Sequence, residues 1–366
     1  MTAVFRRRVS VLPPLPPGVW LRRPVSTLPF PLAEPSCRLF SRARHGLFHA
    51  IDAVGVRAGD ELLVPAYHHG SEVEVLARRG VHARFYDVGP DLTPDPEGLD
   101  KLVGARTRGL YLIHYVGVPQ DAERWRRWCD ERGLLLVEDA AQAWLASTAA
   151  GPVGSWGDVA IFCLYKTYGL PDGAAVTARA PALAGPSGEV GFGGKTLLRR
   201  HGRWAAARLG AAAALASWRE ERREYSATRD FELGDPDSPP ARASTLLLAR
   251  VVTDDAAGAR RSNLRWLAAR LGDRVPPALR AVPDGASPHA LPVRTPDPEG
   301  FVAHLADRGV RAFPFWTHAH PSLPKGAFPG ATSWRRELIV LPVHQELRDD
   351  DLERIVAAVE AAPEGC

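Results

Sequence analysis

The chain alternates between short apolar runs and longer amphipathic segments. Three segments have the spacing of helices that bury one face, at 42–54, 71–79 and 122–132. Apolar runs of strand length lie between and after them, at 61–65, 83–88, 110–115, 134–139, 159–162 and 174–177. Strands with apolar residues on both faces are typical of a largely parallel sheet covered by helices on both sides. The pattern therefore predicts an α/β fold with a mostly parallel central sheet.

The second half of the chain has a different pattern. It predicts helix over 195–225, an acidic loop over 229–241, and one long helix over 245–271. After a linker at 276–288, a small α+β unit is expected, with strands at 289–293 and 310–313 and helices at 298–308 and 349–361. We therefore predict an extended proline-rich arm over 1–35, a large domain over 36–245, and a connecting helix with a small C-terminal domain over 246–366.

Composition narrows the class of protein. The 366 residues are 45% hydrophobic and 24% charged, as in ordinary globular proteins, and the net charge is +4. No basic block is interleaved with aromatic residues, so we expect no nucleic-acid partner. Arg6–Arg8 are followed by prolines, and no apolar run is long enough to span a bilayer, so neither a signal peptide nor membrane association is expected. Four scattered cysteines suggest no disulfide framework and no metal site, which fits a cytoplasmic location.

Lysine is unusually scarce. Of 46 lysines and arginines only four are lysines, namely Lys101, Lys166, Lys195 and Lys325. Arginine replaces lysine as a positive charge, but its guanidinium cannot form a Schiff base. Each remaining lysine is thus a candidate for chemistry that arginine cannot perform, although chance survival is the favoured explanation for any one of them taken alone.

Several motifs, taken in order, resemble the DegT/StrS family of aminotransferases that depend on pyridoxal 5′-phosphate (PLP). The first two are Val137-Glu138-Asp139-Ala140-Ala141-Gln142, and a segment from Gly154 to Phe162 that runs into Lys166. Segments 59–65, 113–117 and 341–344 support them. The resemblance implies fold type I, with a large PLP-binding domain and a small C-terminal domain.

The resemblance assigns roles to three of these residues. Lys166 would carry PLP as a Schiff base and move protons during the reaction. Asp139 would face the pyridine nitrogen and favour its charged form, although a strand-end aspartate is also a common helix cap. Gln142 would contact the phenolic oxygen of the ring. Burial is expected to depress the pKa of Lys166.

Further cofactor contacts follow from the same resemblance. The phosphate turn falls on Arg44 and His45 at the start of a helix, where Arg44 is otherwise a surface residue. The ring-stacking position falls on His69, with Tyr67 and His68 as close competitors. Cys163 stands where the family commonly has a serine near the phosphate, and it is alternatively a small buried filler.

One family feature is missing. Members usually carry an Asn- and Arg-containing loop about forty residues after the lysine, which enters the active site of the partner subunit. We find no such loop in residues 195–241. The stretch 209–218 is open to interpretation as a dimer contact, a lid or a membrane-surface helix, and packing against the body of the protein is the favoured interpretation.

The resemblance implies a homodimeric biosynthetic enzyme. It would transfer an amino group from a small-molecule donor, glutamate in the family, to a keto substrate such as a nucleotide-linked keto sugar. Two alternatives stay open: another PLP reaction on the same fold, such as elimination or decarboxylation, and a degenerate PLP-binding protein with a non-catalytic role.

Overall fold

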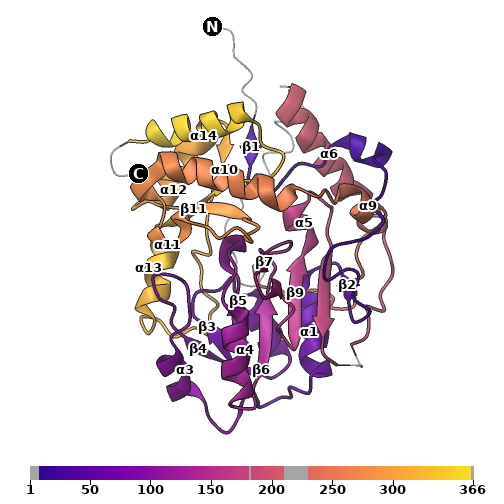
Figure 1. The fold of residues 1–366 in the computed structure, drawn as a ribbon, viewed down its shortest axis with the longest axis vertical. Helices are drawn as coiled ribbons and strands as arrows, with labels where there is room; N and C mark the ends of the chain where they lie inside the picture. Colours follow the sequence, from indigo (N-terminus) through magenta and orange to yellow (C-terminus); the bar gives the residue numbers. More distant parts are fainter. Residues whose placement is uncertain (1–7, 181–182, 210–229, 364–366) are drawn as a thin grey trace.

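The computed structural model describes residues 8–180, 183–209 and 230–363. Its largest feature is a seven-stranded sheet, over one end of which a smaller C-terminal unit is placed (Figure 1). In spatial order the strands of this sheet are β2 (Arg38–Phe40), β10 (Ala174–Ala178), β9 (Val159–Cys163), β6 (Leu135–Asp139), β5 (Thr107–Ile113), β3 (Glu61–Pro65) and β4 (His82–Tyr86).

The five strands from β9 to β4 are parallel, and β10 is antiparallel to both of its neighbours. This confirms the prediction of a mostly parallel sheet. The helices between the strands are α1 (Ala43–Ala53), α2 (Ser71–Arg78), α3 (Pro96–Leu102), η2 (Tyr115–Gly117), α4 (Ala122–Asp130) and α5 (Leu164–Thr167). A small hairpin, β7 (Ser147–Thr148) with β8 (Gly151–Pro152), lies between β6 and β9.

The two faces of the sheet bury different clusters. Along β9, Ile161 and Cys163 belong to a cluster shared with α1, whereas Ala160 and Phe162 pack with Trp144 in a second cluster. Alternate residues of a strand point to opposite faces, so an apolar run is needed where both faces are covered. This explains why the central strands show no polar alternation.

The C-terminal unit contains a three-stranded sheet in the order β11 (Ala290–Arg294), β14 (Leu338–Pro342) and β13 (Phe313–Pro314). The helices of the second half of the chain are α6 (Gly194–Leu209), α9 (Arg242–Val251), α10 (Ala256–Leu271), η4 (Gly272–Arg274), α11 (Pro277–Arg280), α12 (Pro298–Asp307), α13 (Pro329–Glu337) and α14 (Asp349–Glu360). Helix α10 runs across the molecule between this unit and the end of α5 (Figure 1).

The N-terminal segment is packed along the body of the protein. Strand β1 (Val9–Ser10) pairs in parallel with β12 (Val310–Arg311) of the C-terminal unit. Val11, Leu15 and Val19 are buried, the last within η1 (Pro17–Leu21). The predicted arm therefore packs against the C-terminal unit through β1 and against the sheet region through Leu15 and Val19. The proposed domain boundaries stay a prediction.

The predicted single helix over 245–271 is wrong. The structure has two helices, because Val252 adopts an extended conformation after α9 and α10 begins only at Ala256. The break contains β-branched residues followed by Asp254 and Asp255, which favour helix ends over helix interiors. The predicted strand over 310–313 is likewise divided into β12 and β13, which pair with different partners.

The helix predicted over 195–225 is confirmed as far as Leu209, and the rest, including most of 209–218, lies outside the described residues. Within the part of the chain that is described, no helix combines the length and apolarity needed to cross a membrane.

Candidate active site

A cavity of about 460 Å³ opens at the carboxyl ends of the central strands. Ile113, Asp139 and Cys163 are the last residues of β5, β6 and β9, and all three line it. In open α/β sheets this edge is where ligands bind. The structure brings six predicted site residues to this one cavity, namely Arg44, His69, Asp139, Gln142, Cys163 and Lys166.

The carboxylate of Asp139 is held by two hydrogen bonds. Tyr111 Oη donates to Oδ2 at 2.8 Å, and the Ala141 N–H donates to Oδ1 at 2.9 Å. Burial raises the pKa of Asp139, against the opposing effects of these donors and of Lys166. Asp139 is therefore fixed at the cavity wall by Tyr111, a residue that the sequence did not single out.

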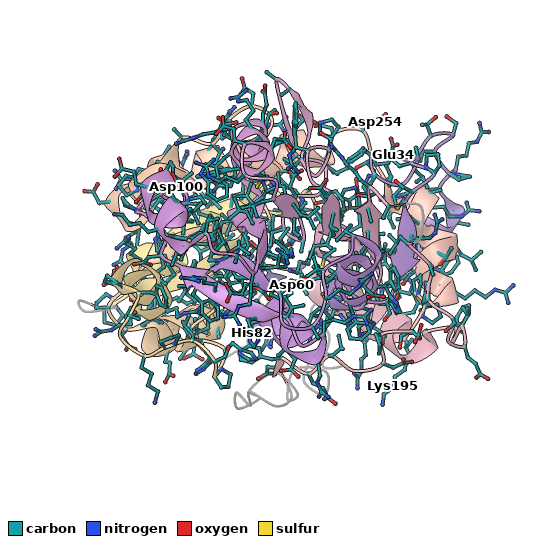
Figure 2. The ribbon with its side chains drawn as sticks, turned by 90° about the horizontal axis from the view of Figure 1, so that it is seen from below. Glu34, Asp60, His82, Asp100, Lys195 and Asp254 are labelled. Carbon is teal, nitrogen blue, oxygen red and sulfur yellow. The ribbon has the colours of Figure 1, made fainter. Side chains whose placement is uncertain are left out.

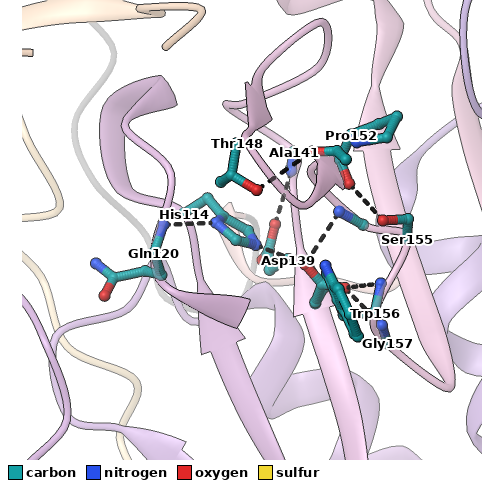
Figure 3. Close-up of polar contacts among 12 residues, drawn as sticks. His114, Gln120, Asp139, Ala141, Thr148, Pro152, Ser155, Trp156 and Gly157 are labelled. Carbon is teal, nitrogen blue, oxygen red and sulfur yellow. Dashed lines mark hydrogen bonds and ion pairs between the residues drawn. The ribbon is translucent and has the colours of Figure 1, made fainter. Parts of the chain in front are cut away.

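The buried side chains of His114 and Glu138 are hydrogen-bonded to each other and fix the end of β6 next to Asp139 (Figure 3). Glu138 accepts hydrogen bonds from His114 Nε2 at 3.0 Å and from the N–H groups of Gly154 and Trp156 at 3.0 and 2.8 Å. The Gln120 N–H donates to His114 Nδ1 at 3.0 Å, so the proton of the neutral ring lies on Nε2. The motif segment 154–158 is thus tied to the strand that carries Asp139.

Lys166 lies on the short helix α5, directly after β9. Arg260 of α10 donates to the carbonyl oxygen of Thr167 at 2.6 Å, and Gln345 Nε2 donates to the same oxygen at 3.1 Å. The side-chain amine of Lys166 lines the cavity and has no hydrogen-bond or ion-pair partner among the described residues. The other three lysines are exposed.

The pKa of Lys166 differs from the sequence-based expectation. Burial lowers it, but Cys163, Tyr165, Asp139 and Glu72 together outweigh burial and raise the pKa above its ordinary value. The expected depression is therefore wrong for the cavity as it stands, because the thiol of Cys163, the phenol of Tyr165 and two carboxyl groups all favour the charged amine.

Among the three candidate stacking residues, only His69 lines the cavity. Tyr67 and His68 are fully buried and form hydrogen bonds with backbone carbonyl groups. Tyr67 Oη donates to Phe315 O at 3.1 Å, and His68 Nδ1 donates to Pro65 O at 2.8 Å. The Nδ1 atom of His69 is buried without a hydrogen-bond partner. Burial, with Lys166 and Arg44, lowers the pKa of His69 to about 3, so the ring is neutral.

The turn that carries His69 is held by Glu72. Its carboxylate accepts hydrogen bonds from the N–H groups of His69 at 3.0 Å and Gly70 at 3.1 Å. Burial, followed by the charge of Asp139, raises the pKa of Glu72. Glu72 also lines the cavity, and no sequence signal pointed to it.

Helix α1 begins at the cavity wall, and no side chain caps its N-terminus. Arg42 and Arg44 both line the cavity, and Arg44 Nη1 also donates to Glu232 O at 2.6 Å. His45 does not line it, because its ring is held between Ser41 Oγ at 2.9 Å and Leu233 O at 2.8 Å. The side chain of His45 is therefore turned to Leu233, and the predicted contact of the helix turn at Arg44 and His45 with a phosphate stays a prediction.

The short segment that precedes α9 also contributes to the cavity wall. Asp230 and Phe231 line the cavity, and the ring of Phe231 packs against Gly70, where an added Cβ would lie 2.5 Å from it. Gly70 has a φ of 115°, a conformation that favours glycine. The cavity residues that sequence reasoning missed include Leu12, Arg42, Glu72, Tyr111, Tyr165, Asp230, Phe231, His289 and the segment 313–318.

Comparisons with known proteins agree with this geometry. The model of the DegT/DnrJ/EryC1/StrS aminotransferase family matches residues 36–211. A dTDP-3-amino-3,4,6-trideoxy-alpha-D-glucose transaminase of Streptomyces venezuelae is 28% identical over 85% of this chain and 78% of its own length. An L-glutamine:2-deoxy-scyllo-inosose aminotransferase of Streptomyces fradiae is 33% identical over 41% of this chain and 36% of its own. The crystal structure of the aminotransferase TlmJ from Streptoalloteichus hindustanus has a TM-score of 0.64 and 25% identity, covering 89% of this chain and 85% of that one.

Proposed function

Because the chain is a divergent member of the DegT/DnrJ/EryC1/StrS aminotransferase family, we propose that it uses PLP to transfer an amino group to a keto substrate. The observation that carries the proposal is the convergence of Lys166, Asp139 and an uncapped helix N-terminus on one cavity. The family model, the two relatives and the TlmJ structure all support the reaction class.

The residues of the cavity fit a phosphorylated pyridine aldehyde. The first turn of α1 and the guanidinium groups of Arg42 and Arg44 suit a phosphate group. The Nδ1 atoms of His69 and His289 are buried without partners, which is costly unless a ligand contacts them. Gln142 Oε1 accepts a hydrogen bond from the Val116 N–H at 2.7 Å, and its amide nitrogen has no partner among the described residues.

The roles of the side chains follow from their chemistry. When bound, PLP supplies an aldehyde for amines and a ring that withdraws electrons from the neighbouring carbon. Lys166 would hold that aldehyde. Once released, its amine would move a proton between the Cα atom of the amino donor and the C4′ carbon of the cofactor. Asp139 would stabilise a protonated ring nitrogen, and the neutral ring of His69 would stack on the pyridine.

The donor and the acceptor are proposed from the relatives. We propose glutamate or glutamine as amino donor, because one relative is named for L-glutamine and glutamate is the donor that the sequence resemblance implies. As acceptor we propose a keto sugar, including one linked to a nucleotide, since the Streptomyces venezuelae relative is named for a dTDP-linked amino sugar. We also propose that the protein is a homodimer and that it acts in a biosynthetic pathway in the cytoplasm.

An amino-transfer assay tests this function. Purified protein with PLP is incubated with glutamate or glutamine and a panel of keto sugars, and the amino product is detected by mass spectrometry. Lys166→Ala should lower the rate by about 10²-fold or more. Lys195→Ala is the matched control, because Lys195 lies at the exposed edge of the molecule (Figure 2). Equal rates for wild type and Lys166→Ala, or no amino product with any pair, would contradict the proposal.

A further inference from the structure

The helix that carries Lys166, α5, is a single turn. It spans Leu164–Thr167, and the Tyr168 N–H closes it by donating to Leu164 O at 3.1 Å. Tyr168 itself is extended, so the chain leaves the helix at once. A helix of this length is unstable in isolation, and the last carbonyl groups of any helix have no partner within it. The position of Lys166 therefore depends on the contacts that other elements make with this turn.

Two side chains bind the end of the turn. Arg260 Nη2 donates to Thr167 O at 2.6 Å, and Gln345 Nε2 donates to the same oxygen at 3.1 Å. Arg260 Nε also donates to Gln345 Oε1 at 2.8 Å. The guanidinium, the amide and the carbonyl oxygen thus form a closed ring of three hydrogen bonds. Because a carbonyl oxygen accepts two hydrogen bonds, the carbonyl group that follows Lys166 is fully paired and held in one direction.

Gln345 belongs to the C-terminal unit and directly follows the end of β14. The segment that carries it is held to α10 by Asn263 Nδ2, which donates to Val343 O and His344 O, both at 3.2 Å. The same unit supplies residues 313–318 to the cavity wall, whereas Gln345 is not among the described residues that line the cavity. Gln345 therefore contacts the turn of Lys166 from outside the cavity, where it acts on the backbone of α5 and not on a ligand.

We propose that Gln345 is a positioning residue for Lys166, because its hydrogen bond to Thr167 O makes the C-terminal unit hold the turn from which the lysine side chain enters the cavity. The lysine and the cavity wall at 313–318 are then kept in one arrangement by the same unit. The proposal rests on the proposed function only in taking Lys166 as the reacting amine.

A competing role for Gln345 is to hold Arg260, whose guanidinium also donates to Pro288 O at 2.8 Å. Two substitutions separate the roles. Gln345→Glu keeps an oxygen for Arg260 Nε but turns a second oxygen to Thr167 O, and a carboxylate oxygen cannot donate. Gln345→Ala removes both bonds. Asn263→Ala is the matched control, since it frees the same segment from the same helix and leaves the bonds to α5 in place.

Amide hydrogen exchange of the full chain, freed of any bound PLP, measures how often the turn opens. The Tyr168 N–H reports this opening, because its bond to Leu164 O exists only while α5 is formed. Loss of the hydrogen bond from Gln345 should make this exchange about threefold to tenfold faster in Gln345→Ala and in Gln345→Glu. In Asn263→Ala the exchange of Tyr168 should equal that of wild type.

Labelling of Lys166 in the same samples tests whether the turn places the amine. Each protein is treated with acetic anhydride at constant pH, and acetylation of the four lysines is followed by mass spectrometry. Lys101, Lys195 and Lys325 are exposed and serve as internal references. A turn that opens more often brings the amine of Lys166 to the reagent more often. Labelling of Lys166 relative to the references should therefore rise with the exchange rate in both Gln345 variants, and stay at the wild-type level in Asn263→Ala.

Wild-type exchange and labelling in a folded Gln345→Glu would overturn the proposal, because Gln345 would then only hold Arg260. If Gln345→Glu does not fold, the comparison of Gln345→Ala with Asn263→Ala decides, and equal changes in these two variants would overturn it.

Both measurements are made without PLP, so they are independent of the amino-transfer assay. The expected changes at α5 in a protein that transfers no amino group would keep the role of Gln345 and reject the proposed function. An active enzyme whose Gln345 variants show unchanged exchange and labelling would keep the proposed function and reject the role of Gln345.

Discussion

At the scale of single residues, the cavity is built around polar side chains that are each held by one or two neighbours. Asp139 is held by Tyr111 and Ala141, and the His69 turn is held by Glu72. The sequence identified Asp139, Lys166 and His69 because they follow recognisable motifs and spacings. It did not identify Glu72, Tyr111 or His289, because a lone polar residue in an apolar segment carries no signal until the fold brings it to the cavity.

The role of Asp139 can be tested by removing its charge. Asp139→Asn keeps the shape and the contact with Tyr111, but an amide does not stabilise a protonated ring nitrogen. We expect the rate of amino transfer to fall by about 10²-fold with little change in the free energy of unfolding. Tyr111→Phe is the milder control, since it leaves the carboxylate in place. A variant that retains the full rate would show that Asp139 only caps the strand end.

The neutral histidine His68 makes stability depend on pH. Burial, with Arg335, lowers its pKa to about 3, far below the ordinary value of about 6.5. At pH values above this ordinary pKa the ring is neutral in both the folded and the unfolded chain. The contribution of His68 to the free energy of unfolding is then fully present. As the pH falls from there towards 3, only the unfolded chain takes up the proton, so stability is lost at up to about 1.4 kcal/mol per pH unit.

Urea unfolding of wild type and His68→Phe between roughly pH 7 and pH 5 measures this effect. Phe keeps the aromatic packing against Phe85 but cannot be protonated. We expect the free energy of unfolding of the variant to depend less steeply on pH than that of wild type. Parallel pH curves for the two proteins would contradict the assignment.

At the scale of elements, periodicity located most helices and strands but not their interruptions. The segment 245–271 has the pattern of one helix, yet the chain forms two helices, α9 and α10, and is extended at Val252 between them. Short strands such as β1 and β2 were missed, because pairing between residues far apart in sequence defines them. Pairing of this kind depends on tertiary contacts and not on the local pattern.

The packing of α1, the helix that begins at the cavity, depends on a glycine. A Cβ on Gly46 would collide with Val176 of β10 and lie 2.8 Å from Phe40 of β2. Gly46→Ala should therefore lower the free energy of unfolding by about 1–3 kcal/mol, although alanine is the better helix former. Gly202 of α6 has no neighbour within 4 Å of such a Cβ, so Gly202→Ala should be neutral or stabilising by up to about 1 kcal/mol. Chemical denaturation measures the free energy of unfolding of both variants and so separates the effect of packing from that of helix propensity. Equal changes in Gly46→Ala and Gly202→Ala would contradict the close contact at Gly46.

At the scale of the whole molecule, the cavity exists because distant segments meet. Leu12, Lys166, Phe231 and Trp316 come from the N-terminal segment, the sheet region, the segment after α6 and the C-terminal unit, and all line it. The family resemblance predicted the sheet edge correctly, since motifs mark it. It did not predict the contribution of Asp230 and Phe231, because no motif in the sequence marks that segment.

Arg260 is the buried link between these parts. Its guanidinium donates to Gln345 Oε1 and to the carbonyl groups of Pro288 and Thr167, and no described carboxylate neutralises it. Arg260→Leu would leave these acceptors unpaired, so we expect a loss of roughly 2–5 kcal/mol in the free energy of unfolding. Arg265→Leu, which removes the exposed pair with Asp284, should change the free energy of unfolding far less. Urea unfolding measures both, and similar costs would contradict the role of Arg260 as a link.

The central claim of the account is that Lys166 carries PLP. Purified protein is incubated with PLP, reduced with borohydride, digested, and searched by mass spectrometry for the pyridoxyl group on each of the four lysines. The account predicts stable modification at Lys166, and no comparable modification at Lys101, Lys195 or Lys325, which are exposed and lie outside the cavity. Modification spread evenly over the exposed lysines, or none at Lys166, would contradict it.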